Sequence, residues 1–143
     1  MKNKTQLACT ISLLLGAVVV MVINFSVGFM GDKPEAVNIA ATIFYLIFWI
    51  LMLRFKPAAK TSSLLSLYTM IGSVVGFCSI AGNWAGGFVS VILVPLTFPV
   101  GALFYGLRFM QDFKIFYLIT ALISFVILIF SLITLVNGPS KEK

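Results

Sequence analysis

The stretch from Gly72 to Gly106 restricts the possible folds more than any other part of the chain. It contains no charged residue, yet it carries most of the 11 glycines and two of the five prolines. In a water-soluble protein this density of glycine and proline indicates a loop, but here it is embedded in Val, Ile, Leu and Phe. A bend in such surroundings needs protein or cavity water to satisfy its backbone groups. We therefore expect a bent helical hairpin inside a membrane.

The composition of the whole chain favours the same environment. Of its 143 residues, 61% are hydrophobic and 10% are charged, whereas soluble domains have about 25% charged residues. The net charge of +6 does not indicate nucleic-acid binding, because the Lys and Arg residues lie in short clusters at the ends of apolar runs. We expect the lipid bilayer as a partner and no nucleic acid.

Five apolar runs are separated by short polar segments. The sequence therefore predicts a single transmembrane domain over residues 1–143, an all-α bundle of five transmembrane helices with short loops. The expected spans are residues 7–29, 37–53, 64–81, 88–107 and 115–136. The fourth is expected to be kinked at Pro95 and Pro99, because proline removes a backbone donor and clashes one turn back. The alternative is four spans plus a re-entrant or broken hairpin within residues 72–106.

The cations predict the orientation of these five spans. Seven would lie on one side of the membrane and three on the other. The seven are Lys2, Lys4, Arg54, Lys56, Lys60, Arg108 and Lys114, and the three are Lys33, Lys141 and Lys143. Because cytoplasmic loops are enriched in Lys and Arg, we expect a cytoplasmic N-terminus and an extracytoplasmic C-terminus. The richness in Lys, Ile and Phe suggests a multi-pass protein of a bacterial cell membrane.

Small and polar residues within the spans are candidates for helix packing or for lining a pore. Gly72 and Gly76 have the GxxxG spacing that lets helices approach closely, and we expect the third and fourth spans to cross there. Asn24 either packs against another helix or lines a polar pocket. The complete set of candidates is Gly16, Asn24, Gly72, Gly76, Asn83, Pro95, Pro99, Thr120 and Ser124.

The sequence offers little for catalysis. It has no histidine, and its four acidic residues fall in predicted loops or in the tail. Cys9 and Cys78 are too far apart in the sequence to form a CxxC redox pair or half of a zinc site. We therefore predict no catalytic residue, no metal site and no cofactor, and we expect that the protein is not an enzyme.

Two functions are compatible with these features. The first is an accessory, regulatory or immunity-type subunit that packs on a membrane-protein partner or on copies of itself. The alternative is a small oligomeric channel or transporter, in which the broken Gly/Pro-rich segment lines a path for a neutral solute or an ion. The first is favoured, because short loops leave no soluble catalytic or sensing domain and the spans lack the ionisable groups common in coupled transport.

Overall fold

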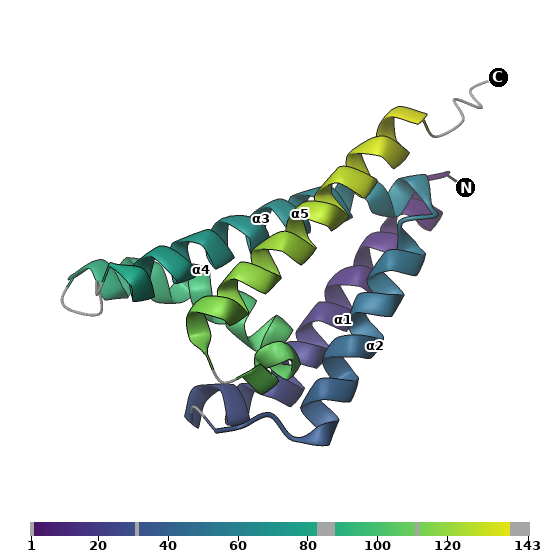
Figure 1. Cartoon of the computed structure of the whole chain (residues 1–143). Helices are drawn as coiled ribbons and strands as arrows, with labels where there is room; N and C mark the ends of the chain where they lie inside the picture. Colours follow the sequence, from purple (N-terminus) through teal and green to yellow (C-terminus); the bar gives the residue numbers. More distant parts are fainter. Residues whose placement is uncertain (1, 31, 83–87, 111, 138–143) are drawn as a thin grey trace.

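The structure is a computed structural model that describes residues 2–30, 32–82, 88–110 and 112–137. In these ranges the chain is helical apart from short turns and contains no strand, which confirms the all-α prediction for them. The helices are α1 (Lys2–Met30), α2 (Ala36–Met52), α3 (Lys56–Ala81), α4 (Phe88–Phe104), the 3₁₀ helix η1 (Tyr105–Met110) and α5 (Phe113–Asn137) (Figure 1).

Among the described residues, three helices are long and apolar enough to cross a membrane: Lys4–Phe25 within α1, Lys56–Ala81 and Phe113–Asn137. Helices α2 and α4 have 17 residues each, or about 25 Å, against a hydrocarbon core of about 30 Å. The five-span bundle is therefore not confirmed. The kink is not confirmed either. Helix α4 continues through Pro95 and Pro99 and tightens to a 3₁₀ helix at Tyr105.

Helix α3 begins earlier than the sequence predicts. The prediction treats residues 54–63 as a polar loop, whereas the helix begins at Lys56. Pro57 lies in the first turn, where its missing N–H would have no partner in any case. Ala58 and Ala59 are fully buried, so this turn packs into the bundle. The cations Lys56 and Lys60 consequently belong to a helix rather than to a loop.

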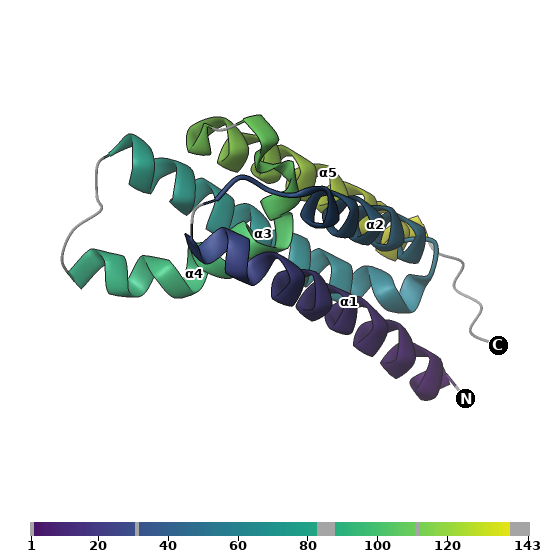
Figure 2. The same ribbon diagram turned by 90° about the horizontal axis from the view of Figure 1, so that it is seen from below.

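The helices form two antiparallel pairs that meet near the N-terminus and diverge toward the opposite end (Figures 1 and 2). Helices α1 and α2 form one hairpin, and α3 pairs with α5 along most of its length. The hydroxyls of Ser62 and Ser131 lie 2.8 Å apart, and those of Thr10 and Thr61 lie 2.9 Å apart. The beginning of α1, the beginning of α3 and the end of α5 therefore lie at one end of the molecule, as Figure 1 shows.

The end of α4 and the helix η1 lie at the opposite end of the molecule from the N-terminus. The Tyr105 hydroxyl donates to the backbone carbonyl of Asp32, in the α1–α2 loop. In the five-span prediction, by contrast, the segment after the fourth helix shares a side with the N-terminus. The difference arises because α4 packs along the second half of α3, and η1 then turns back toward the α1–α2 loop.

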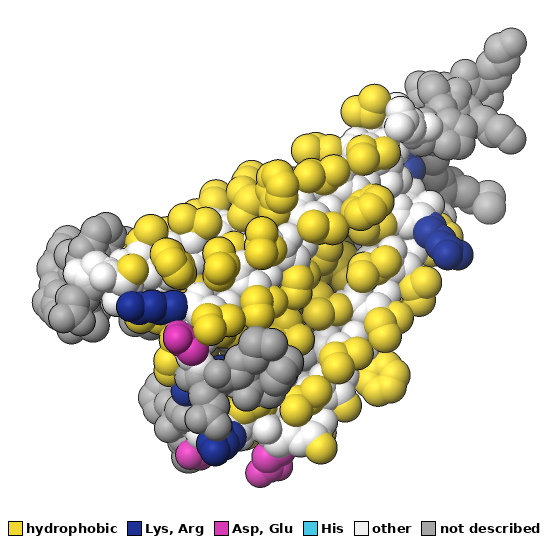
Figure 3. Space-filling view, viewed as in Figure 1, with side chains coloured by type: hydrophobic (Ala, Val, Ile, Leu, Met, Phe, Trp, Pro, Cys, Tyr) yellow, Lys and Arg dark blue, Asp and Glu magenta, His cyan; other side chains and the backbone are white. Residues whose placement is uncertain are grey.

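The surface is largely apolar. Large hydrophobic side chains on α1, α2, α3 and α5 are exposed, among them Val22, Phe44, Leu64 and Val136. Figure 3 shows hydrophobic side chains across most of one face, with charged side chains near its ends. This outer surface is the kind that a lipid environment covers.

Candidate functional site

A cluster of buried polar side chains lies where the end of α4 meets α1 and α2. It consists of Asn24, Asn38 and Thr42, none of which is more than 1% exposed, and we call it the amide cluster. Asn24 comes from the last third of α1, whereas Asn38 and Thr42 are one turn apart in α2. The α1–α2 hairpin holds the cluster in place, and the cluster bonds to the backbone of a third element.

Each asparagine of the cluster uses both of its N–H donors. The Nδ2 of Asn24 donates to Thr42 Oγ1 at 3.1 Å and to the Ala102 carbonyl at 2.8 Å. The Nδ2 of Asn38 donates to Asn24 Oδ1 at 3.1 Å and to the Ile23 carbonyl at 3.2 Å. Asn38 Oδ1 in turn accepts the backbone N–H of Glu35 at 2.9 Å, at the start of α2. The cluster thus connects three helices through one set of hydrogen bonds.

Gly106 brings the backbone of η1 into contact with this cluster. Its N–H donates to Thr42 Oγ1 at 3.2 Å. A Cβ at this position would lie 2.3 Å from the carbonyl oxygen of Asn38 and 2.7 Å from Thr42 Oγ1. Only glycine permits this approach, so residue 106 is where η1 docks on α2.

A second polar set, which we call the hydroxyl ladder, joins α3 to α5. Its three rungs are Ser62 with Ser131, Thr69 with Ser124, and Ser73 with Thr120, at oxygen separations of 2.8, 2.8 and 2.9 Å. None of the six residues is more than 1% exposed. Trp49 of α2 joins the ladder, because its Nε1 donates to Ser62 Oγ at 2.7 Å. Ser62 therefore links α2 and α5 through α3.

The predicted glycines lie at three different helix contacts. Gly16 of α1 faces the ring of Tyr45 in α2, and Gly72 of α3 faces Val100 and the Leu96 carbonyl of α4. Gly76, however, faces the Tyr117 ring of α5. The two glycines of the GxxxG pair therefore adjoin different helices, because residues four apart on a helix drift by about 40° and two partner helices flank α3.

The other predicted positions divide between the two polar sets and α4. Thr120 and Ser124 belong to the hydroxyl ladder, and Asn24 belongs to the amide cluster. Pro95 and Pro99 lie within α4, whose helical assignment continues through both. Asn83 is outside the described residues.

The sequence prediction misses two thirds of each polar set. The residues absent from the candidates are Asn38 and Thr42 of the amide cluster and Ser62, Thr69, Ser73 and Ser131 of the ladder. A signal was present: in α3, small hydroxyl residues and glycines recur every three or four positions, at Ser62, Ser66, Thr69, Gly72, Ser73 and Gly76. That spacing matches one face of a helix and complements the spacing of Thr120 and Ser124 in α5.

The Arg108 guanidinium joins η1 to neighbouring segments at the end of the molecule near the amide cluster. The guanidinium carbon of Arg108 lies 3.8 Å from the centre of the Phe113 ring and 5.3 Å from that of Tyr105. Arg108 also donates to the Tyr105 hydroxyl, which donates to the Asp32 carbonyl. These contacts fasten η1 and the beginning of α5 to the α1–α2 loop, with cation–π attraction adding to the hydrogen bonds.

The amide cluster and the hydroxyl ladder contain only uncharged polar side chains. Both polar sets consist of amides and hydroxyls that bond to one another or to backbone groups. Within the described ranges, every buried side-chain nitrogen or oxygen has a hydrogen-bond partner, and no three His, Cys, Asp or Glu side chains gather as metal ligands. The hydrogen bonds of both sets run between helices, so this geometry joins the helices to one another.

Comparison of the chain with models of protein families, with curated proteins and with solved structures gave no match.

Proposed function

We propose that this chain is a multi-pass membrane protein that acts, without catalysis of its own, as an accessory or regulatory subunit through helix packing. In the proposed topology α1, α2, α3 and α5 cross the bilayer, and α4 with η1 enters and leaves it on one side. This arrangement is related to the predicted alternative with a re-entrant hairpin, but the re-entrant part begins at Phe88. The proposed topology leaves both termini on the same side of the membrane.

The observation that carries the functional proposal is the pairing of polar groups inside the bundle. A conduit needs polar atoms that face a path, whereas Asn24, Thr120 and Ser124 use theirs in bonds to other helices. Polar residues used in this way act as fasteners between membrane helices. What remains for recognition is the apolar outer surface, which suits contact with lipid or with the helices of a partner.

The charges are compatible with the proposed topology. At the N-terminal end of the molecule, the sequence places Lys2, Lys4, Arg54, Lys56 and Lys60, and it continues beyond α5 with Lys141 and Lys143. The opposite end has Lys33, Arg108 and Lys114 together with Asp32, Glu35 and Asp112. Seven cations against three satisfy the positive-inside rule with a cytoplasmic N-terminus, as they do in the five-span prediction, so the rule alone does not separate the two.

Purification and flux measurement test the functional proposal. The full chain carrying an affinity tag is expressed in a bacterial membrane, solubilised in mild detergent and isolated together with any bound membrane protein. We expect a stable complex or self-association, and no flux of neutral solutes or ions above that of empty liposomes after reconstitution. A monomer that binds no other membrane protein and supports solute flux would instead favour the channel.

A second variant strengthens the flux assay. Under the conduit alternative the bent segment shapes the path, so Pro99→Ala should alter flux, whereas under the proposed packing role it leaves assembly intact and flux at the background level. Flux that depends on Pro99 would overturn the proposal.

A further inference from the structure

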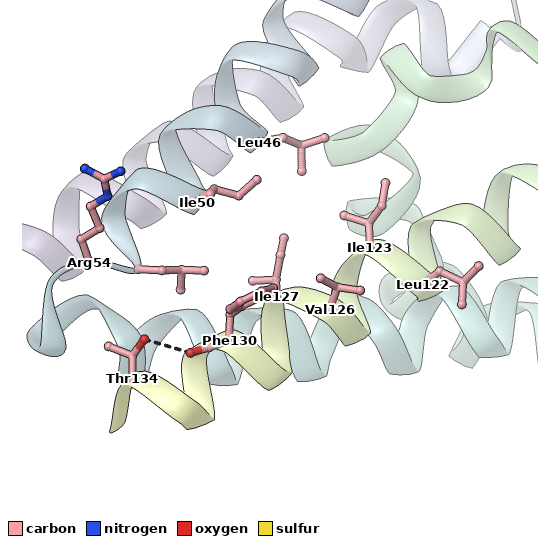
Figure 4. A pocket seen from close by; sticks show the side chains of 10 residues that line it. Leu46, Ile50, Arg54, Leu122, Ile123, Val126, Ile127, Phe130 and Thr134 are labelled. Atoms are coloured by element: carbon pink, nitrogen blue, oxygen red, sulfur yellow. Dashed lines mark hydrogen bonds between the residues drawn. The ribbon is translucent and has the colours of Figure 1, made fainter. Parts of the chain in front are cut away.

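A groove runs along the outside of the bundle between α2 and α5. Its cavity volume is about 670 Å³. The walls and floor come from both helices: Leu46, Ile50, Leu53 and Arg54 at or just after α2, and Leu122, Ile123, Val126, Ile127, Phe130 and Thr134 of α5. Figure 4 shows these side chains on the two facing segments, and Figure 3 shows the hollow among hydrophobic side chains.

The structure keeps the two walls apart. Trp49 of α2 bonds to Ser62 of α3, and Ser62 pairs with Ser131 of α5, so α3 stands between the two helices beneath the groove. Leu53 and Ile127 are buried, whereas Ile50, Val126 and Phe130 are exposed. The groove is therefore part of the helix arrangement and is open toward the surroundings of the protein.

The polar groups of the groove are confined to one end. Arg54 and Thr134 lie there, and Leu46, Leu122 and Ile123 line the other end (Figure 4). The Thr134 hydroxyl is already bonded to the Phe130 carbonyl at 2.9 Å. The exposed Arg54 is thus the charged side chain of the lining, and it stands at the end of the molecule that we propose to be cytoplasmic.

We infer that this groove binds one anionic phospholipid, with an acyl chain between α2 and α5 and the phosphate at Arg54. The inference rests on the proposed membrane topology. From Leu122 to Thr134 the groove is about 18 Å long at 1.5 Å per residue, close to the roughly 15 Å depth of one leaflet's hydrocarbon. Basic sites between membrane helices on the cytoplasmic side suit anionic headgroups.

The chemistry of the groove favours a lipid chain over a helix of another protein. An acyl chain is thinner and needs no hydrogen bonds from walls that are apolar except at one end. The cation at that end complements a phosphate, whereas it would be desolvated beneath a partner helix.

Lipid competition tests the headgroup site. The full chain is purified in mild detergent with equal amounts of phosphatidylglycerol and phosphatidylcholine that have the same acyl chains, and the lipids retained are counted by native mass spectrometry. We expect one retained lipid per chain, chiefly phosphatidylglycerol. Arg54→Gln should lower the ratio of bound phosphatidylglycerol to phosphatidylcholine about fivefold, the effect of one cation near anionic lipid. Lys60→Gln is the control, because Lys60 is exposed but does not line the groove.

A second pair of variants tests the acyl-chain site. Val126→Trp fills the groove and should abolish the retained lipid. Leu132→Trp is matched to it, because both residues lie on α5 and are 48% exposed, but Leu132 lies outside the groove and should keep the lipid. The inference is overturned if either Arg54→Gln or Val126→Trp retains phosphatidylglycerol as the unmodified chain does. It is also overturned if Val126→Trp breaks a dimer while lipid retention stays the same.

Membrane association is measured separately, so that the two proposals can fail independently. A chain that alkaline carbonate releases from membranes contradicts the proposed membrane topology and the lipid site with it. If the chain stays in the membrane but its lipid ratio is the same with and without the Arg54→Gln substitution, only the lipid site is lost.

Discussion

At the scale of single residues, amide side chains fix where α4 ends. Transfer of an amide out of water without a hydrogen bond costs roughly 2–7 kcal/mol, and Asn24 and Asn38 are both fully or almost fully buried. The donors of Asn24 bond to Thr42 Oγ1 and the Ala102 carbonyl, and those of Asn38 bond to Asn24 Oδ1 and the Ile23 carbonyl. The bond to Ala102 positions α4, because it joins a side chain of α1 to one specific backbone group.

Replacement of the central amide should therefore be costly. Asn24→Leu removes both donors and leaves the Ala102 carbonyl and the Asn38 amide without their partner, so we expect a loss of about 1–3 kcal/mol in the free energy of unfolding. Unfolding of the protein in mixed micelles with increasing denaturing detergent measures it. A double-mutant cycle of Asn24→Ala with Thr42→Ala should show a coupling of at least about 0.5 kcal/mol. Strictly additive effects would contradict a shared network.

Gly106 gives a second prediction at this scale. Gly106→Ala should lower the yield of folded protein and its melting temperature, because the new Cβ would meet the Asn38 carbonyl, a backbone atom that cannot move aside. Gly101→Ala is the matched control in the same segment, since its Cβ would lie 3.8 Å from the Tyr117 hydroxyl oxygen, an ordinary contact. Equal melting temperatures for the two variants in the same detergent would show that η1 does not dock as described.

At the scale of helices, matched hydroxyls join α3 to α5 alongside apolar contacts such as that of the Tyr117 ring with Gly76. Small side chains let two backbones approach closely, and hydroxyls of the ladder also bond within their own helix, as Ser73 does to the Thr69 carbonyl at 2.7 Å. The outward faces of the same helices carry Leu64 and Phe125, which are exposed. Small polar residues inside and large apolar residues outside form the arrangement expected where lipid replaces water.

Each rung of this ladder should make its own modest contribution to the free energy of unfolding. Thr69→Val removes the bond to Ser124 while preserving shape, and we expect a loss of about 0.6 kcal/mol in the free energy of unfolding, as is typical for hydrogen bonds between membrane helices. Thr134→Val serves as the control, because that hydroxyl bonds within its own helix, to the Phe130 carbonyl. A loss for Thr134→Val as large as that for Thr69→Val, measured in the same micelles, would argue against the ladder.

At the scale of the whole molecule, the sequence predicts the class of fold but not the path of the chain. Apolar runs and short polar turns are local signals, and they predict helices close to those observed. The position of α4 depends instead on contacts between residues far apart, such as Asn24 with Ala102 and Gly72 with Leu96. The number of cations on each side does not distinguish the two topologies. The proposed topology places Arg108 and Lys114 outside and Lys141 and Lys143 in the cytoplasm, the reverse of the five-span prediction, so both have seven cytoplasmic cations and three outside.

The two topologies make opposite predictions for chemical labelling of intact cells. In a background of Cys9→Ser and Cys78→Ser, single cysteines are introduced by Lys4→Cys, Lys33→Cys, Lys114→Cys and Asn137→Cys, all at exposed positions. A membrane-impermeant maleimide added from outside should label the cysteines at 33 and 114, because the Tyr105–Asp32 bond draws η1 and the start of α5 toward the α1–α2 loop.

The cysteines at positions 4 and 137 should react only after the membrane is permeabilised, because antiparallel pairing of α3 with α5 returns the chain to the side where it began. Labelling of the cysteine at 33, which both topologies leave outside, serves as the internal standard. If the cysteine at 137 reacts from outside and the one at 114 does not, the chain crosses the membrane five times, and α4 must then leave the contacts with Asn24 and Thr42 that define its end.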